Sequence, residues 1–209
     1  MHEAVEVLHN AIQSGQKIAI YGDYDADGVT SSAILYEFLA QLGLDARVYI
    51  PNRFDEGYGL NLEAIEQLAD EGVKLLITVD CGISSVAEVA RASELGMRVI
   101  ITDHHQVPEV LPDAAAIINP HRPTDPYPYK ELAGVGIAWK LVVAYLQRYP
   151  NPEIDPDQWL DLVAIGTVVD VAELNGENRS LVKRGLALMR MHPRQGLFSL
   201  SQVAGIKLD

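Results

Sequence analysis

Short apolar runs alternate with amphipathic stretches along the first half of the chain. The runs are rich in Val, Ile and Leu, and they predict buried β-strands at 17–21, 47–50, 74–79, 97–102 and 115–118. Between the runs, apolar residues recur at three- and four-residue spacing, which predicts helices at 3–13, 29–41, 62–69 and 85–95. Alternating strands and helices indicate right-handed βαβ units. We therefore expect an α/β fold with a five-stranded, mainly parallel sheet flanked by helices.

The pattern changes after Asn119. Prolines recur too often between residues 119 and 128 for regular structure. Apolar periodicity then predicts helices at 136–148, 157–168 and 180–191, whereas 197–209 carries no clear helix-terminus signal. We divide the chain into an α/β core at 1–130 and a helical part of the same domain at 131–209.

Four segments each end an apolar run with acids or histidines: Asp23-Tyr24-Asp25-Ala26-Asp27-Gly28, Thr78-Val79-Asp80, Thr102-Asp103-His104-His105 and Val168-Val169-Asp170. In parallel sheets, ligands bind beyond the carboxyl ends of the strands, where three of these segments fall. Carboxylates gathered there repel one another unless a cation lies among them. The sequence therefore predicts a divalent-metal site in the α/β core, with two metals, suited to phosphate-ester chemistry.

The run of three aspartates has other interpretations. An extended backbone would aim Asp23, Asp25 and Asp27 in one direction. A calcium loop of the EF-hand type also opens with alternating aspartates and a glycine, but it needs a Glu where this chain has Ile34. Helix capping by acids explains only one or two of the three.

The other acids and histidines carry alternatives of their own. Asp80 precedes a turn, where an aspartate is often a helix cap, and Asp170 in its apolar run needs either a buried salt bridge or a metal. The adjacent His104 and His105 point in different directions on a non-helical backbone, so one can ligate a metal while the other contacts substrate; two exposed loop histidines are the alternative. Cys81 has no base at a suggestive spacing, and we expect a small buried thiol.

Composition sets broader limits. The chain has 209 residues, of which 48% are hydrophobic and 22% charged, as in ordinary globular proteins. No apolar stretch is long enough to span a bilayer, and the first residues lack signal-peptide features, so we expect no membrane association. Together with the single cysteine, this favours the reducing cytoplasm.

The net charge of −13 argues against a generic basic surface for nucleic acids. It does not exclude a nucleic-acid substrate, because part of the acid excess falls in the expected metal site. We expect the basic pairs His121-Arg122 and Lys183-Arg184 to be solvent-exposed surface residues, and the alternative is that they contact phosphate.

Taken in order, these motifs resemble those of the DHH phosphoesterase superfamily, and within it the RecJ-type branch of single-strand-specific exonucleases. The resemblance rests on residues 21–30, on Ile50-Pro51-Asn52-Arg53-Phe54 with Glu56-Gly57-Tyr58-Gly59, on residues 78–82, on Asp103-His104-His105 and on Leu132-Ala133-Gly134-Val135-Gly136. It covers most of the chain, from about Ala4 to Met191.

The resemblance implies an enzyme, a hydrolase that removes nucleotides from the 5′ end of single-stranded DNA in repair and recombination. It implies two divalent cations, Mn²⁺ or Mg²⁺, with Asp80 bridging. One cation would be held by Asp23, Asp25 and Asp80, and the other by Asp27, Asp80, His104 and Asp170.

Further roles also follow from the resemblance alone. His105 would face the scissile phosphate, Asp103 would orient its neighbours, and Arg53 would contact a phosphate, with a surface salt bridge as the alternative for Arg53. Relatives of this kind carry a C-terminal companion domain and further nucleic-acid-binding modules that this sequence lacks. Any single-strand-binding protein or helicase would act as a partner through those absent regions.

Two other functions stay open. One is a superfamily enzyme acting on a small substrate, such as pyrophosphate, a short oligonucleotide or a cyclic dinucleotide. The other is a non-catalytic scaffold of the same fold. The loop of Arg53 and the form of the first motif favour the exonuclease over the first, and the complete set of candidate ligands argues against the second.

Overall fold

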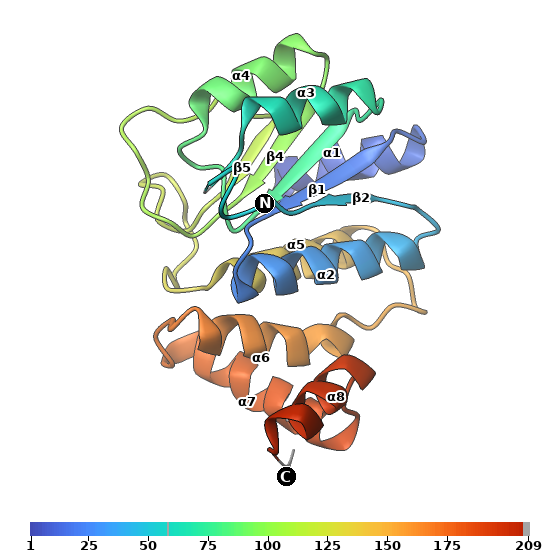
Figure 1. The fold of residues 1–209 in the computed structure, drawn as a ribbon, viewed down its shortest axis with the longest axis vertical. Helices are drawn as coiled ribbons and strands as arrows, with labels where there is room; N and C mark the ends of the chain where they lie inside the picture. Colours follow the sequence, from blue (N-terminus) through green and yellow to red (C-terminus); the bar gives the residue numbers. More distant parts are fainter. Residues whose placement is uncertain (58, 207–209) are drawn as a thin grey trace.

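The computed structural model describes residues 1–57 and 59–206 (Figure 1). Tyr58 of the second motif, and residues 207–209 of the segment 197–209, lie outside the described residues. The sheet has five strands in the order β2-β1-β3-β4-β5, and every pairing is parallel. This confirms the predicted α/β class. The strands are β1 (Ile18–Gly22), β2 (Arg47–Tyr49), β3 (Leu75–Val79), β4 (Arg98–Thr102) and β5 (Ala116–Ile118).

Helices cover both faces of the sheet (Figure 1). One face carries α1 (His2–Gln13), α2 (Ala26–Gln41) and α5 (Gly134–Arg148), and the other carries α3 (Leu62–Asp70) and α4 (Val86–Glu94). A further layer lies outside α2 and α5. It consists of a short 3₁₀ turn, η1 (Pro156–Trp159), followed by α6 (Leu160–Val169), α7 (Gly176–Met191) and α8 (Gln195–Ala204).

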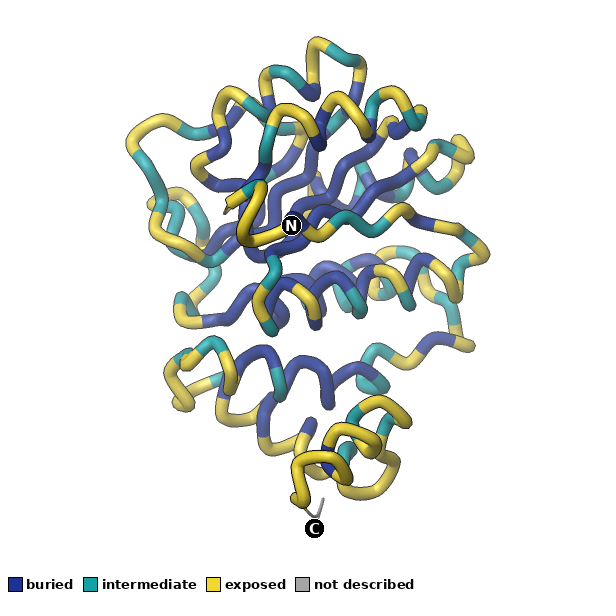
Figure 2. The backbone as a smooth tube through the Cα atoms, in the orientation of Figure 1, coloured by how far each residue is buried: buried dark blue, intermediate teal, exposed yellow. Residues whose placement is uncertain are grey.

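The sheet separates two apolar cores, and the central strands β1 and β3 are buried along their whole length (Figure 2). The larger core lies under α1, α2 and α5, where Phe38 meets Trp159 edge-on at 6.4 Å between ring centroids. Trp159 also donates from its indole nitrogen to Glu37 at 2.7 Å, so the third layer is tied to α2 by both apolar packing and a hydrogen bond. Within the described residues, no helix is long and apolar enough to cross a membrane.

Two helices begin earlier than the apolar pattern predicts, because their first residues are mostly polar. Helix α2 begins at Ala26 and α7 at Gly176, several residues before their apolar stripes, because side chains and turns rather than apolar residues define those ends. The segment after Leu197 forms most of α8, which the pattern missed and which ends at Gly205 with φ 67°. The division between 130 and 131 stays a prediction.

Candidate metal centre

The carboxyl ends of three adjacent strands bring the acidic segments together. In the parallel register Gly22 pairs with Val79, and Val79 pairs with Thr102. Asp23, Asp80 and Asp103 each follow one of these strand ends directly. The three side chains therefore emerge side by side at one edge of the sheet, as the strand pattern predicts.

Asp80 sits in a strained backbone conformation. Its φ is 61°, in the left-handed region that non-glycine residues rarely adopt, and its side chain is 1% exposed. Its amide donates to the Thr102 carbonyl at 2.9 Å, which extends the sheet ladder by one residue and fixes this conformation. The neighbouring Gly82 has φ 106°, and a β-carbon there would lie 2.8 Å from the Thr78 hydroxyl. The turn thus directs the Asp80 carboxylate into the site at a conformational cost of about 1–3 kcal/mol.

The backbone does not stay extended through the first motif, so the three aspartates do not point in one direction. Asp25 is extended and caps α2 by accepting from the Gly28 amide at 3.0 Å, while Asp27 already lies in the first helical turn. Gly28 permits this tight start, because a β-carbon there would lie 2.5 Å from the Asp23 carbonyl oxygen. The carboxylates of Asp23 and Asp25 consequently group together, and that of Asp27 faces a different set of side chains.

Asp27 is held by the N-terminus of α5. Its two carboxylate oxygens accept from the Gly134 amide at 2.7 Å and from the Val135 amide at 2.8 Å. A β-carbon at Gly134 would lie 2.8 Å from the Asp80 carboxylate, and one at Gly166 would lie 2.9 Å from the Asp27 carboxylate, so glycines allow both helices to approach. Burial, followed by the charge of Asp80, raises the pKa of Asp27 to about 8.

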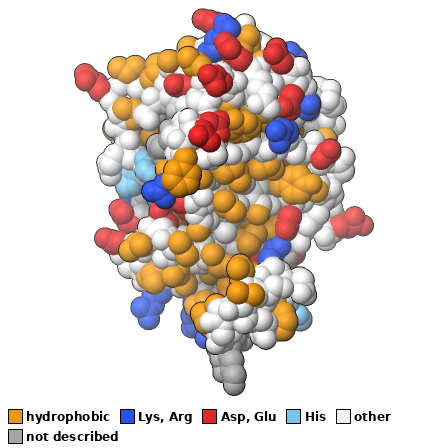
Figure 3. Space-filling model, in the orientation of Figure 1, with side chains coloured by type: hydrophobic (Ala, Val, Ile, Leu, Met, Phe, Trp, Pro, Cys, Tyr) orange, Lys and Arg blue, Asp and Glu red, His pale blue; other side chains and the backbone are white. Residues whose placement is uncertain are grey.

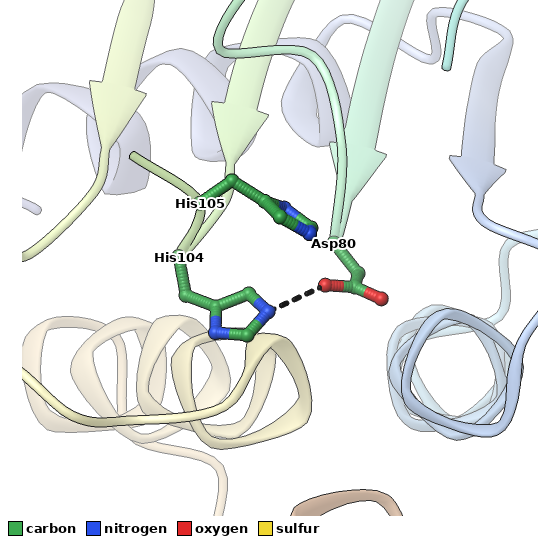
Figure 4. A group of neighbouring side chains, drawn as sticks. All are labelled: Asp80, His104 and His105. Carbon is green, nitrogen blue, oxygen red and sulfur yellow. Dashed lines mark ion pairs between the residues drawn. The ribbon is translucent and has the colours of Figure 1, made fainter. Parts of the chain in front are cut away.

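His104 points into the middle of the acids. Its Nε2 lies 3.0 Å from an Asp80 oxygen, drawn as the dashed line in Figure 4, and 3.8 Å from an Asp27 oxygen. On the other side of the ring, Nδ1 lies 4.0 Å from an oxygen of Asp170, which ends α6. One imidazole therefore bridges three of the four segments singled out in the sequence.

His105 turns toward Asp103 instead. One Asp103 oxygen accepts from the His105 amide at 2.9 Å and lies 2.7 Å from its Nδ1, and the other accepts from the Ile83 amide at 2.9 Å. The hydrogen bond to Asp103 is the main cause that raises the pKa of His105 to about 9. Burial alone would raise the pKa of Asp103, but the hydrogen bonds from His105 and Ile83 outweigh it and hold that pKa below its usual value.

Three groups of side chains place their ligand atoms within 4.8 Å of one another. They are Asp23, Asp25 and Asp80; Asp27, His104 and Asp170; and Asp80, His104 and His105. The first is the set expected for one metal, and the second contains three of the four residues expected for the other. Asp80 belongs to two groups, as a bridging ligand would. The assignment of individual ligands stays a prediction.

The donor set suits hard divalent cations. Carboxylate oxygens with one or two imidazoles are the ligands that Mn²⁺ and Mg²⁺ sites use. Burial and neighbouring carboxylates raise the pKa of Asp80 to about 9, so the acids are unfavourable together in their charged forms. Bound cations would relieve that repulsion, and the residues therefore fit a pair of divalent metals.

Arg53 lies beside the first group of acids. Its guanidinium stacks over the Tyr24 ring at 5.3 Å from the centroid, and its charge slightly offsets the raised pKa of Asp23, which burial dominates. It forms no ion pair with the described residues, so the surface salt bridge considered as its alternative is absent from them. Its phosphate contact stays a prediction.

The sequence missed the residues that support the site. Asn119, 0% exposed, donates to the His105 carbonyl at 2.9 Å and accepts from the His121 amide at 2.8 Å, which anchors the histidine turn to the end of β5. The amides of Gly134 and Val135, at the start of α5, belong to the motif at 132–136, to which the sequence pattern assigns no role. Cys81 is fully buried with a pKa raised by burial, in agreement with an unreactive thiol, and Ile34 lies in the core, which excludes the calcium loop.

Fold and site together define an α/β domain with an acidic, histidine-bearing metal centre at the carboxyl edge of a parallel sheet. A family model described as "DHH family, N-terminal domain" matches residues 17–167. The chain belongs to this family.

Relatives within the family are single-stranded-DNA-specific exonucleases. The RecJ protein of Bacillus subtilis is 47% identical over 205 residues, which cover 98% of this chain and 25% of that protein. A crystal structure of exonuclease RecJ bound to manganese is 40% identical with a TM-score of 0.89, covering 99% of this chain and 52% of that one. RecJ of Thermus thermophilus in complex with Mg²⁺ is 32% identical with a TM-score of 0.66, covering 99% and 26%. The chain therefore spans between a quarter and about half of the length of these relatives.

Proposed function

We propose that this chain is the catalytic core of a metal-dependent phosphodiesterase that removes nucleotides from the 5′ end of single-stranded DNA. The observation that carries the proposal is the convergence of seven candidate ligand residues from four segments at one sheet edge, with Asp80 and His104 each shared between groups. Relatives that are named for this activity, and that hold manganese or magnesium in solved structures, support it.

The chain's own residues divide into holding and positioning groups. Asp23, Asp25 and Asp80 would hold one cation, and Asp27, Asp80, His104 and Asp170 the other. When bound, such a pair supplies Lewis-acid chemistry: it activates water and neutralises charge that develops on the phosphate. The α5 amides fix the orientation of Asp27, so this ligand does not have to reorganise during the reaction.

His105 and Arg53 would contact the substrate. His105 is half-exposed, and Asp103 and Asn119 fix its ring and its backbone. With a pKa of about 9 it carries a positive charge near neutral pH, which suits contact with a scissile phosphate. Arg53, stacked over the Tyr24 ring, adds a second cation near Asp23. The proposal places the activity in the cytoplasm, in DNA repair and recombination, with protein partners bound by other parts of the full-length protein.

The test is digestion of 5′- and 3′-labelled single strands with manganese, magnesium or chelator. We expect metal-dependent release from the 5′ end, abolished in Asp80→Ala, with duplex and 3′-end controls resistant. Turnover of Asp80→Ala at the wild-type rate with manganese would refute the assignment of the centre. Preference for pyrophosphate or a cyclic dinucleotide over single strands would move the chain to the small-substrate class.

A further inference from the structure

Helix α7 carries a concentration of positive charge in an otherwise acidic chain. Among its 16 residues are Arg179, Lys183, Arg184 and Arg190, against one acid, Glu177, whereas the whole chain has a net charge of −13. Arg184 is neutralised by an ion pair with Asp157. Arg179, Lys183 and Arg190 are all exposed.

These three positions share one side of the helix. With Leu186 between them, residues 179, 183 and 190 follow spacings of four, three and four, so they form a single row about 16 Å long. Neither Arg179 nor Lys183 forms an ion pair with any carboxylate of residues 1–57 or 59–206. Two unneutralised cations on one helix face form a surface to which an anion can bind.

The row borders a shallow, open groove of about 320 Å³. Its lining alternates the cations with apolar side chains: Leu174, Arg179, Val182, Lys183, Leu186 and Arg190. Charged groups beside apolar ones suit a chain that carries regular negative charges and apolar faces, such as the phosphates, sugars and bases of a single strand.

The groove also begins next to the metal centre. Leu174 is four residues beyond Asp170, so the two lie within about 14 Å by the reach of the chain. Figure 3 shows histidine side chains at the left edge of the molecule, acidic side chains just below them, and basic side chains lower still over α6 and α7. A strand with one end at the metals can continue along this side of the molecule.

From these observations we infer that the α7 groove binds the phosphate backbone of the single strand some nucleotides away from the bond that is cleaved. The inference rests on the proposed function, and it adds a second contact region in this domain. An acidic peptide would also meet the cations, but the proximity of a phosphodiester-cleaving centre favours the nucleic acid.

The test compares two double variants with equal change of charge. Arg179→Gln with Lys183→Gln removes the two cations of the groove, and Lys74→Gln with Arg98→Gln removes two at the opposite edge of the sheet, where β3 and β4 begin. Fluorescence anisotropy of a labelled single strand is measured across a salt series, with calcium replacing the catalytic metal. Each lost phosphate contact lowers the slope of log K against log salt by about 0.7.

We expect the groove variant to bind several-fold more weakly, with a slope shallower by about 1.4, and the control to match wild type. Cleavage of a dinucleotide, too short to reach the groove, should be unchanged, while KM for a long strand rises. Equal slopes in both variants, or a groove variant that loses only binding to a glutamate-rich peptide, would overturn the inference. Absence of cleavage by the wild-type chain would instead refute the proposed function, and the binding comparison would still decide the groove.

Discussion

Buried acids should make the metal-free protein less stable as pH rises. Asp80 has an ordinary pKa of 3.8 and a folded pKa of about 9, and Asp27 is raised in the same direction. A carboxyl with a raised pKa binds more protons in the folded than in the unfolded state, so stability is highest below pH 3.8 and declines until pH passes the folded value. His105, also raised to about 9, loses its stabilising charge over the upper part of the same window.

The size of the effect follows from linkage. Each group that stays protonated only in the folded state lowers the free energy of unfolding by about 1.4 kcal/mol per pH unit. For Asp80, which is 1% exposed, this amounts to about 4 kcal/mol between about pH 5 and about pH 8. That is a large share of the roughly 5–15 kcal/mol that stabilises a typical domain.

Urea unfolding in chelator across this pH range measures the effect. Asp80→Asn keeps the shape and removes the charge, so its stability should fall less steeply than wild type, while Asp113→Asn on an exposed loop should leave the slope unchanged. Excess manganese should reverse the trend in wild type, because deprotonated ligands bind metal and metal binding stabilises the fold. A chelated wild type as stable at about pH 8 as at about pH 5 would refute the reasoning.

Three further outcomes follow from the geometry. Gly134→Ala would place a β-carbon 2.8 Å from the carboxylate of Asp80, a proposed metal ligand, so calorimetry should show weaker manganese binding. Gly136→Ala, whose β-carbon would meet only the flexible end of Leu132 at 3.1 Å, should bind manganese normally. Val171→Gly should raise the free energy of unfolding by about 1 kcal/mol, because φ at Val171 is 61° and glycine relieves that strain. An unchanged free energy of unfolding in urea would contradict this. His104→Ala should lose metal affinity while His105→Ala keeps it and loses rate; equal losses in manganese titrations would show that the two roles are not divided.

The sequence predicted the sheet well because buried parallel strands are continuous apolar runs. All five strands lie within two residues of their expected bounds. The same pattern placed Asp23, Asp80 and Asp103 at one edge, since strand ends and ligand positions are linked by topology. The segment from Leu132 to Gly136 stands out only through the family resemblance. Its role depends on packing between helices that are distant in the sequence, and the apolar pattern does not show that packing.

What the sequence could not supply is conformation set by local hydrogen bonds and tertiary contact. Nothing in the sequence shows that Asp80 adopts φ 61°. The sequence allows one or two aspartates of the first motif to cap a helix, but it does not show that Asp25 is the cap while Asp27 turns inward. Asn119 looked like the start of a proline-rich loop, yet it is buried and anchors His105. Helix α8 was missed although Gly205, which adopts φ 67°, is a helix stop signal that the sequence contains.

The bonds between Asp27 and the amides of Gly134 and Val135 have a consequence for folding. They join positions 107 and 108 residues apart, so the centre closes a long loop that contains most of the sheet. A complete ligand cage therefore exists only once α5 has docked, and metal affinity becomes a reporter of the last stage of assembly. With the chain nicked between residues 119 and 130, the first fragment keeps Asp23, Asp25 and Asp80, so we expect it to bind manganese weakly alone and more tightly once the fragment that carries α5 and Asp170 is added back. The cation would then hold the two pieces together.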